Sequence, residues 1–348
     1  MIPLGSGVFQ ATSRNTGLLS RRSSVSFVDG FESLTGLSVI IMVGIVFVGI
    51  ALFIFFLYAW SFLRQGRSLG KRFVPYEPRT PVPWTGLELF AFCVAWILMI
   101  AVSVGVCRSW ELSSHIKERA LEPKQVLELQ KEHGISHLIV VGRDDPLVFL
   151  VVFLAGVIVI PIGEEFLFRL LLQGYAEKQE GRLRRLLGFF AARGFFSVFG
   201  CATIFAAIHW RSTTEERSIQ NLFDGLLGMM IGYLIVLTLI TVYLLCVRGA
   251  TARDLGVNWQ KIPGDCLLGL GTAVFLFPPI YCLNYGLITW VGETDLDFTL
   301  DPIPLFFFAV GAGVLYFRTH RLLPVIVLHA LFNGIGVASA YISAYVLF

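Results

Sequence analysis

Five polar side chains suited to hydrolytic chemistry lie within three apolar stretches of the chain. The first stretch, PIGEEFLFRLLLQG, holds Glu164 and Glu165, and the second, FAAIH, ends at His209. The third, HALFN, begins at His329 and ends at Asn333. A carboxylate and an imidazole can together hold and deprotonate a water molecule. A second imidazole and an amide can stabilise the oxyanion of a tetrahedral intermediate, so this set of groups is suited to hydrolysis of a peptide bond.

The same side chains also allow a metal-dependent version of this chemistry. Glu164, His209 and His329 are candidate ligands of a Zn²⁺ ion, with the fourth position left for water. The residues alone leave the two versions open. The HExxH and GxSxG motifs and an intramembrane aspartate pair, which mark other hydrolytic routes, do not occur in the sequence.

Helical spacing relates the polar residues of the first stretch. Glu165 and Arg169 are four residues apart, so they share a helix face and can neutralise each other. Glu164 points about 100° away around the helix and has no partner within its own span. Pro161 and Gly163 lie just before it, and we expect them to kink the helix or to free a backbone carbonyl. Glu164 therefore needs a partner from another helix.

Two other helices can supply such partners. Phe205 and His209 are four residues apart, as are His329 and Asn333, so each pair shares a helix face. The midpoint between Glu164 and His209 falls just after the basic cluster RLRR, so a helical hairpin would bring both residues to a similar depth. An ionisable group inside a membrane costs on the order of 2.5–3.5 kcal/mol. We therefore expect these side chains to converge.

The composition of the chain places it in a membrane. Of its 348 residues, 56% are hydrophobic and only 15% are charged, and the mean hydropathy is +0.75. A soluble domain averages about 25% charged residues. The net charge of +3 is too small to indicate nucleic-acid binding. The expected partners are the lipid bilayer and a membrane-embedded protein or peptide substrate, and the expected location is integral, in the inner membrane of a bacterial cell.

The predicted fold class is all-α, a polytopic integral membrane helical bundle with about eight transmembrane helices. Apolar runs near the length of about 20 residues that spans a bilayer as a helix recur along the chain. They lack the period-2 alternation expected of strands. The predicted spans cover 37–63, 85–107, 147–173, 194–210, 222–247, 264–290, 303–317 and 322–346.

The sequence predicts three parts. Residues 1–36 are rich in Ser, Gly, Thr and Arg, and we expect them to form a disordered N-terminal tail. Residues 37–146 hold the N-terminal membrane spans and a polar loop, 108–146, whose segment EPKQVLELQKEHG predicts a surface helix. Residues 147–348 form the predicted catalytic membrane domain, with an inserted helical pair at about 222–302.

The three motifs together resemble the CPBP family, which contains the CAAX prenyl protease type II and bacteriocin-processing intramembrane proteases. The resemblance covers about 147–210 and 303–337. The family pattern of EExxxR, FxxxH and HxxxN corresponds here to EEFLFR (164–169), FAAIH (205–209) and HALFN (329–333).

This resemblance implies an all-helical protease, described in the family as a metalloprotease, whose site opens into the bilayer. It implies that Glu164 and His209 activate the water, while His329 and Asn333 form the oxyanion pocket. A metal-free glutamate mechanism has also been argued for the family, and we favour it over Zn²⁺. The residues that the resemblance implies for shaping the site are Glu165, Arg169 and Phe205.

Two features depart from the family pattern, and two other functions stay open. Leu170 stands where the family often has glycine, and the interval from His209 to His329 is long because it holds the predicted inserted pair. A non-catalytic membrane scaffold would use the polar groups only to join helices. A transporter or proton relay would also need intramembrane Glu and His. The sequence does not name a substrate, which can be prenylated or not.

Overall fold

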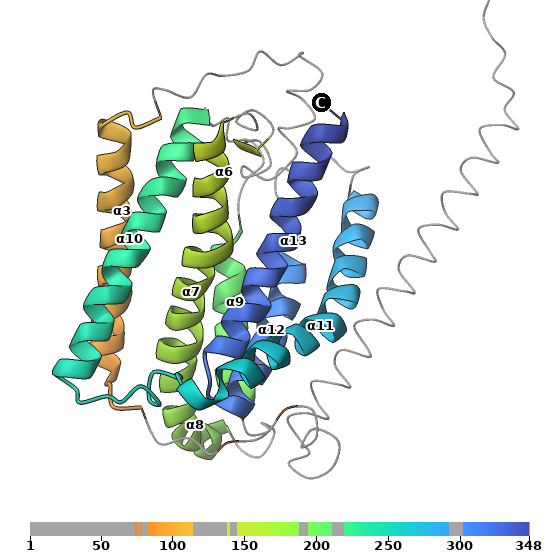
Figure 1. Cartoon of the computed structure of the whole chain (residues 1–348). Helices are drawn as coiled ribbons and strands as arrows, with labels where there is room; N and C mark the ends of the chain where they lie inside the picture. The colour runs from red at the N-terminus through yellow and green to blue at the C-terminus, as the bar shows by residue number, and fades with distance from the viewer. Residues whose placement is uncertain are drawn as a thin grey trace, which may run out of the picture. The chain divides into compact units, whose positions relative to one another are not determined.

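The structure is a computed structural model that describes residues 74, 77, 82–113, 138–139, 145–187, 194–210, 219–291 and 302–347. The elements formed by these residues are all helices, with no strand among them, which confirms the all-α prediction (Figure 1). The predicted tail, the first predicted span at 37–63 and the predicted surface helix of the polar loop lie outside the described residues.

In the described part of the chain, six helices are long and apolar enough to cross a membrane. Five of them are α3 (Gly86–Ser109), α10 (Ile219–Cys246), α11 (Ile262–Val291), α12 (Pro302–Thr319) and α13 (Leu323–Leu347). The sixth, which we call the site helix, is continuous through α6 (Pro146–Val152), the π-helical η1 (Phe153–Val159), α7 (Ile160–Glu165), the π-helical η2 (Phe166–Gln173) and α8 (Gly174–Leu187).

A further helix, α9 (Phe195–Ile208), is apolar but shorter, at 14 residues. It coincides with the predicted span at 194–210. A 3₁₀ turn, η3 (Trp259–Lys261), leads into α11. Apart from the span at 37–63, each predicted span thus falls on a described helix, and the chain is a polytopic integral membrane protein.

Two helices begin at caps that the sequence provides. The hydroxyl of Thr85 accepts a hydrogen bond from the N–H of Glu88, and the Glu88 carboxylate accepts one from the N–H of Thr85 at 2.7 Å. Asp145 caps α6 by accepting from the N–H of Leu147 at 2.8 Å. Pro146 follows in the first turn, where its missing N–H leaves no helical bond unmade. These caps fix the start of α3 and of the site helix.

Small residues let α10 lie very close to α3, its neighbour in Figure 1. A Cβ on Gly228 would come within 2.5 Å of the Cα of Val104, and one on Gly232 within 2.9 Å of the Cα of Ile100. Backbones this close leave no room for a larger side chain. The GxxxG pair of α10 therefore serves helix packing.

The two helices of the predicted inserted pair contact different parts of the bundle. Helix α10 packs against α3 and against the first half of the site helix. Helix α11 packs against α13 and α12 instead, and α12 also packs against α9 (Figure 1). The helices α10 and α11 of the predicted pair thus pack against different neighbours in the bundle.

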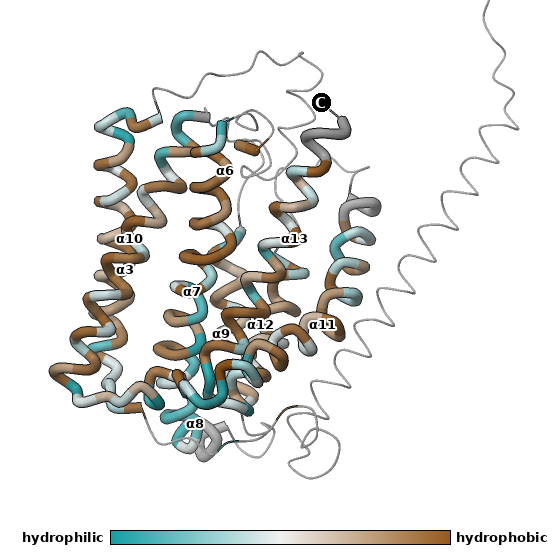
Figure 2. The backbone as a smooth tube through the Cα atoms, viewed as in Figure 1, coloured by the Kyte–Doolittle hydropathy of each residue, from teal (hydrophilic) through white to brown (hydrophobic). Residues whose placement is uncertain are grey.

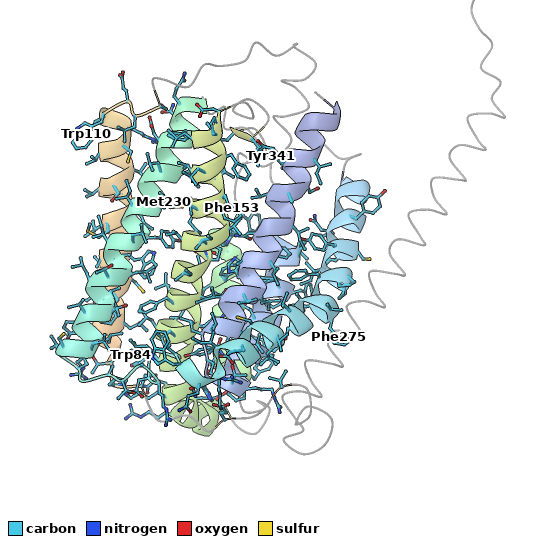
Figure 3. The ribbon with its side chains drawn as sticks, in the orientation of Figure 1. Trp84, Trp110, Phe153, Met230, Phe275 and Tyr341 are labelled. Carbon is cyan, nitrogen blue, oxygen red and sulfur yellow. The ribbon has the colours of Figure 1, made fainter. Side chains whose placement is uncertain are left out.

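Apolar side chains cover much of the outer surface of the described helices. Trp110 is 71% exposed and Phe275 is 67% exposed, and both point outward in Figure 3. Figure 2 shows that hydrophilic residues gather along α7 and at the end of the bundle beside α8. The exposed apolar residues suit contact with lipid, whereas the polar residues on α7 need partners inside the protein.

A short segment before α3, which we call the strap, is bound at the end of the bundle beside α8; its described residues are Val74, Glu77 and Val82–Thr85. The indole N–H of the fully buried Trp84 donates to the carbonyl of Leu171 at 3.2 Å. Four basic side chains donate to strap carbonyls: Lys178 to Val82 and Trp84, Arg248 to Pro83, Arg318 to Val74, and His320 to Glu77.

Candidate active site

The site lies where the site helix widens. In η1 the N–H of Ile160 bonds to the carbonyl of Ala155, five residues back rather than four. In the same register the carbonyl of Gly156 would face the nitrogen of Pro161, which carries no hydrogen. The side chain of Asn333 on α13 takes this place, and its Nδ2 donates to the Gly156 carbonyl at 2.8 Å. The freed carbonyl expected from the sequence is thus bound by one of the predicted site residues.

Glu165 is held by two short contacts. Its Oε2 lies 3.0 Å from Nε of Arg169, which is the pair predicted from the four-residue spacing. Its Oε1 lies 2.7 Å from Nδ1 of His329. Glu165 and Arg169 are fully buried, and His329 is 3% exposed. The charged groups compensate one another where water is excluded, and they join the site helix to α13.

Glu164 lies between two imidazoles that come from different helices. Its Oε1 is 3.8 Å from Nε2 of His209 at the end of α9, and its Oε2 is 3.6 Å from Nε2 of His329 on α13. Both distances exceed the limit of about 3.2 Å for a typical hydrogen bond. The structure therefore brings two predicted site residues, His209 and His329, to the carboxylate of a third, Glu164, without direct hydrogen bonds to it.

The second ring nitrogen of each histidine faces an acceptor. Nδ1 of His209 lies 2.7 Å from the backbone carbonyl oxygen of Phe205, and Nδ1 of His329 lies 2.7 Å from Oε1 of Glu165. A carbonyl oxygen and a carboxylate oxygen can only accept, so Nδ1 carries the hydrogen in both rings. When either ring is neutral, its lone pair is then on Nε2, the nitrogen that faces Glu164.

Phe205 packs among the charged groups of the site. Its ring centroid is 4.5 Å from that of His209 and 5.9 Å from that of His329. The guanidinium carbon of Arg169 lies 5.9 Å from the same ring centre. Because Phe205 is fully buried, it holds both imidazoles in orientation and keeps water away from the guanidinium.

The site is most open on the side of α9. The side chain of His209 is 29% exposed, that of Glu164 is 10% exposed and that of His329 is 3% exposed. His209 follows the last residue of α9 and is its C-cap. Water or a substrate therefore has its most open approach to Glu164 past His209.

Two neighbours of the site were not predicted from the sequence. Gln173 is fully buried and donates from Nε2 to the carbonyl of Gly313 at 2.9 Å. Its position four residues after Arg169 was a signal that could have identified it. Tyr233 on α10 packs against Gly163, the residue before Glu164. No spacing within α10 indicates this contact, because it depends on how α10 packs against the site helix.

The site contains two imidazoles and a carboxylate, which are donor types that zinc binds. Each of the two histidines presents Nε2 while its Nδ1 is bonded, as metal-bound histidines do. Within the described residues, however, no three His, Cys, Asp or Glu side chains are arranged so that they could hold one metal ion. Glu164, His209 and His329 therefore converge without forming a Zn²⁺ site in this structure.

Comparison with known proteins identifies a family for this arrangement. The family model described as type II CAAX prenyl endopeptidase Rce1-like matches residues 146–335. No curated protein and no solved structure matches the chain. The matched range covers more than half of the chain and contains all three motifs, from Glu164 to Asn333. In agreement with the resemblance of those motifs, the chain belongs to the Rce1-like family of type II CAAX prenyl endopeptidases.

Proposed function

We propose that the protein is an intramembrane endopeptidase that hydrolyses a peptide bond through a water molecule activated by Glu164 and His209. The observation that carries the proposal is the position of Glu164 between two Nε2 atoms, 3.8 Å from that of His209 and 3.6 Å from that of His329. The family match supports a CAAX-type protease. We assign the activity to the predicted catalytic domain, residues 147–348.

The catalytic water is bound in this scheme by two acceptors. The ionised Glu164 offers a carboxylate oxygen, and the neutral His209 offers the lone pair on Nε2, so one water can donate a hydrogen to each. Glu164 takes a proton as the water oxygen attacks the carbonyl carbon of the substrate. It returns that proton to the nitrogen as the C–N bond breaks, which leaves a carboxylic acid, an amine and the starting form of Glu164.

Asn333 and His329 stabilise the oxyanion in this scheme. The amide of Asn333 has two hydrogens, of which one is donated to the carbonyl of Gly156. The second can donate to the oxyanion while the first keeps the side chain in place. His329 adds a donor at Nε2 when its ring is protonated.

The contact of His329 with Glu165 sets the direction of its ring. Nδ1 lies 2.7 Å from Oε1 of Glu165, and this contact points Nε2 toward Glu164, which it faces at 3.6 Å.

The proposed substrate is a membrane-associated protein or peptide. The family is named for CAAX prenyl endopeptidases, so a prenylated C-terminal CAAX peptide is the first substrate to test. The exposed side of the site at His209 gives such a chain its approach to Glu164. The contacts of His329 and Asn333 with the site helix would also serve a scaffold, so the family match is what favours the protease over a scaffold and over a transporter or proton relay.

Comparing the protein termini in cells tests the proposal. Membrane proteins would be analysed in cells that carry wild type, Glu164→Gln or, as the matched control, Glu111→Gln in the exposed turn that follows α3, at equal abundance. We expect a set of new N-termini with wild type and with the control that is missing with Glu164→Gln. Identical termini in all three strains would refute proteolysis by Glu164 and favour a scaffold. Solute uptake by proteoliposomes that depends on Glu164 would favour the relay.

A further inference from the structure

The carboxylate of Glu164 is held less tightly than that of its neighbour. Glu165 has contacts of 2.7 and 3.0 Å, whereas the imidazole nitrogens that face Glu164 are 3.6 and 3.8 Å away. A catalytic base must nevertheless be held close to its productive position. The position of Glu164 therefore depends on its backbone, and so on what packs against Gly163, the residue before it.

The ring of Tyr233 packs directly on the backbone of Gly163. A Cβ added to Gly163 would overlap Cδ1 of Tyr233 and would lie 2.5 Å from Cε1 of the same ring. Cζ2 of Trp96 on α3 would be 3.2 Å from that Cβ. Carbon atoms at optimal separation are about 3.5–4.0 Å apart. Only glycine at position 163 therefore lets the ring reach the backbone of the site helix.

The ring that rests on Gly163 is itself firmly held. Tyr233 meets Trp96 edge to face, with ring centroids 5.3 Å apart and an interplanar angle of 88°. Trp96 in turn stacks on Phe166, two residues after Glu164, with centroids 6.4 Å apart. Tyr233 is 7% exposed and Trp96 is 2% exposed. Aromatic rings packed in this way have few alternative positions, so they brace the site helix on both sides of Glu164.

We propose that the ring of Tyr233 is a positioning residue for Glu164. By resting against Gly163, it sets the backbone of the site helix and hence the place of the carboxylate between His209 and His329. This inference rests on the proposed function of Glu164 as the base. It gives α10, which belongs to the predicted inserted pair, a part in the reaction through packing rather than through contact with the substrate.

Three single variants of the full chain test the proposal, with a farnesylated peptide that ends in a CAAX sequence as the probe. Tyr233→Leu removes the ring and should lower kcat about 10- to 100-fold with an unchanged KM, since a shift of about 1 Å has effects of this size. Tyr233→Phe keeps the ring and should retain the wild-type kcat. The control, Gly228→Ala, disturbs the packing of α10 on α3 away from Gly163 and should lower stability but not kcat.

A double-variant cycle tests whether the contact itself carries the effect. Gly163→Ala alone pushes a methyl group into the ring of Tyr233 and should lower kcat. The Tyr233→Leu change makes room for that methyl group, so the double variant should lose less than the two single effects combined. The same coupling should appear in the melting temperatures, a readout that does not depend on activity.

Each result of these experiments decides between the alternatives. A wild-type kcat for Tyr233→Leu, an equal loss for Tyr233→Phe, or additive effects in the cycle would each overturn the positioning role. Full activity of Glu164→Gln would refute the proposed function instead. If Glu164→Gln is inactive but the Tyr233 variants keep the same kcat as Gly228→Ala, the positioning role of Tyr233 is refuted and the proposed function of Glu164 is not.

Discussion

Nδ1 of His329 lies 2.7 Å from Oε1 of Glu165, while Nε2 of the same ring lies 3.6 Å from Oε2 of Glu164. One imidazole thus touches both carboxylates of the adjacent pair but bonds to only one of them. Glu165 is fixed from the other side by Arg169 at 3.0 Å. The second glutamate of the motif orients the ring, and the first one, the proposed base, has no direct hydrogen bond to it.

Removing Arg169 should destabilise the protein strongly. Arg169→Leu leaves the fully buried carboxylate of Glu165 without its cation, and we expect the free energy of unfolding to fall by about 3–5 kcal/mol. The double variant Glu165→Leu with Arg169→Leu should lose less than Arg169→Leu alone, because no unpaired charge stays buried. Chemical unfolding in detergent micelles measures both. A double variant that is the less stable of the two would contradict this account of the pair.

Substitution of two histidines with the same pattern of contacts should change different properties, the activity in one case and the stability in the other. His320, like His209, has Nδ1 at 2.7 Å from a backbone carbonyl and Nε2 facing a carboxylate, here Glu177 at 3.1 Å. His209→Asn should lower kcat by about 10²- to 10⁴-fold and leave the melting temperature unchanged, because its side chain is partly exposed. His320→Asn should lower the melting temperature, because it removes a hydrogen bond to the strap. It should leave kcat unchanged, because His320 does not contact Glu164.

Peptidase assays and thermal unfolding on the two variants check this prediction. If the loss of activity follows the loss of stability in both proteins, His209 is a structural residue and the site assignment is wrong. If only His320→Asn affects kcat, the water lies elsewhere.

The two roles of Asn333 can be separated. Asn333→Leu leaves the carbonyl of Gly156 without a donor, which should lower stability by about 1–3 kcal/mol. It also removes the proposed oxyanion donor, which should lower kcat about 10²- to 10³-fold. Adding Pro161→Ala restores an N–H in the register that faces Gly156, so it should recover stability but not kcat. Recovery of both would show that Asn333 acts only by holding the helix.

Chelators should not reduce the activity. The proposed mechanism uses a water activated by Glu164 and His209 without a metal ion, so we expect the same kcat before and after dialysis against EDTA or 1,10-phenanthroline. Elemental analysis of the purified protein should find less than stoichiometric zinc. Inactivation by chelation that is reversed by added Zn²⁺ would replace the metal-free mechanism with the metal-dependent one.

The helices of this protein were predictable because a bilayer allows few alternatives. Backbone groups in lipid must bond within their own segment, so long apolar runs become helices. The predicted spans at 85–107 and 222–247 correspond to α3 and α10 within three residues at each end. The wide turns of η1 and η2 were not predicted, since they depend on bonds such as that from Asn333 to Gly156.

The contacts of the candidate site that follow from helical spacing could be predicted from the sequence. The four-residue interval between Glu165 and Arg169 gave their contact, and the cost of burying lone charges indicated that the histidines would converge. Tyr233 could not be found in this way. Its role depends on a close approach of two helices, which glycine permits at position 163 but which no periodicity encodes.

The strap bears on which fragments of this protein can fold by themselves. It lies before residue 146, outside the range that the family model matches. It nevertheless accepts hydrogen bonds from four side chains within that range, those of Lys178, Arg248, Arg318 and His320. A fragment that starts at residue 146 would lack the strap carbonyls that accept hydrogen bonds from these four side chains. We therefore expect the smallest fragment that folds by itself to begin before Val74, so that it is longer than the range that the family model matches.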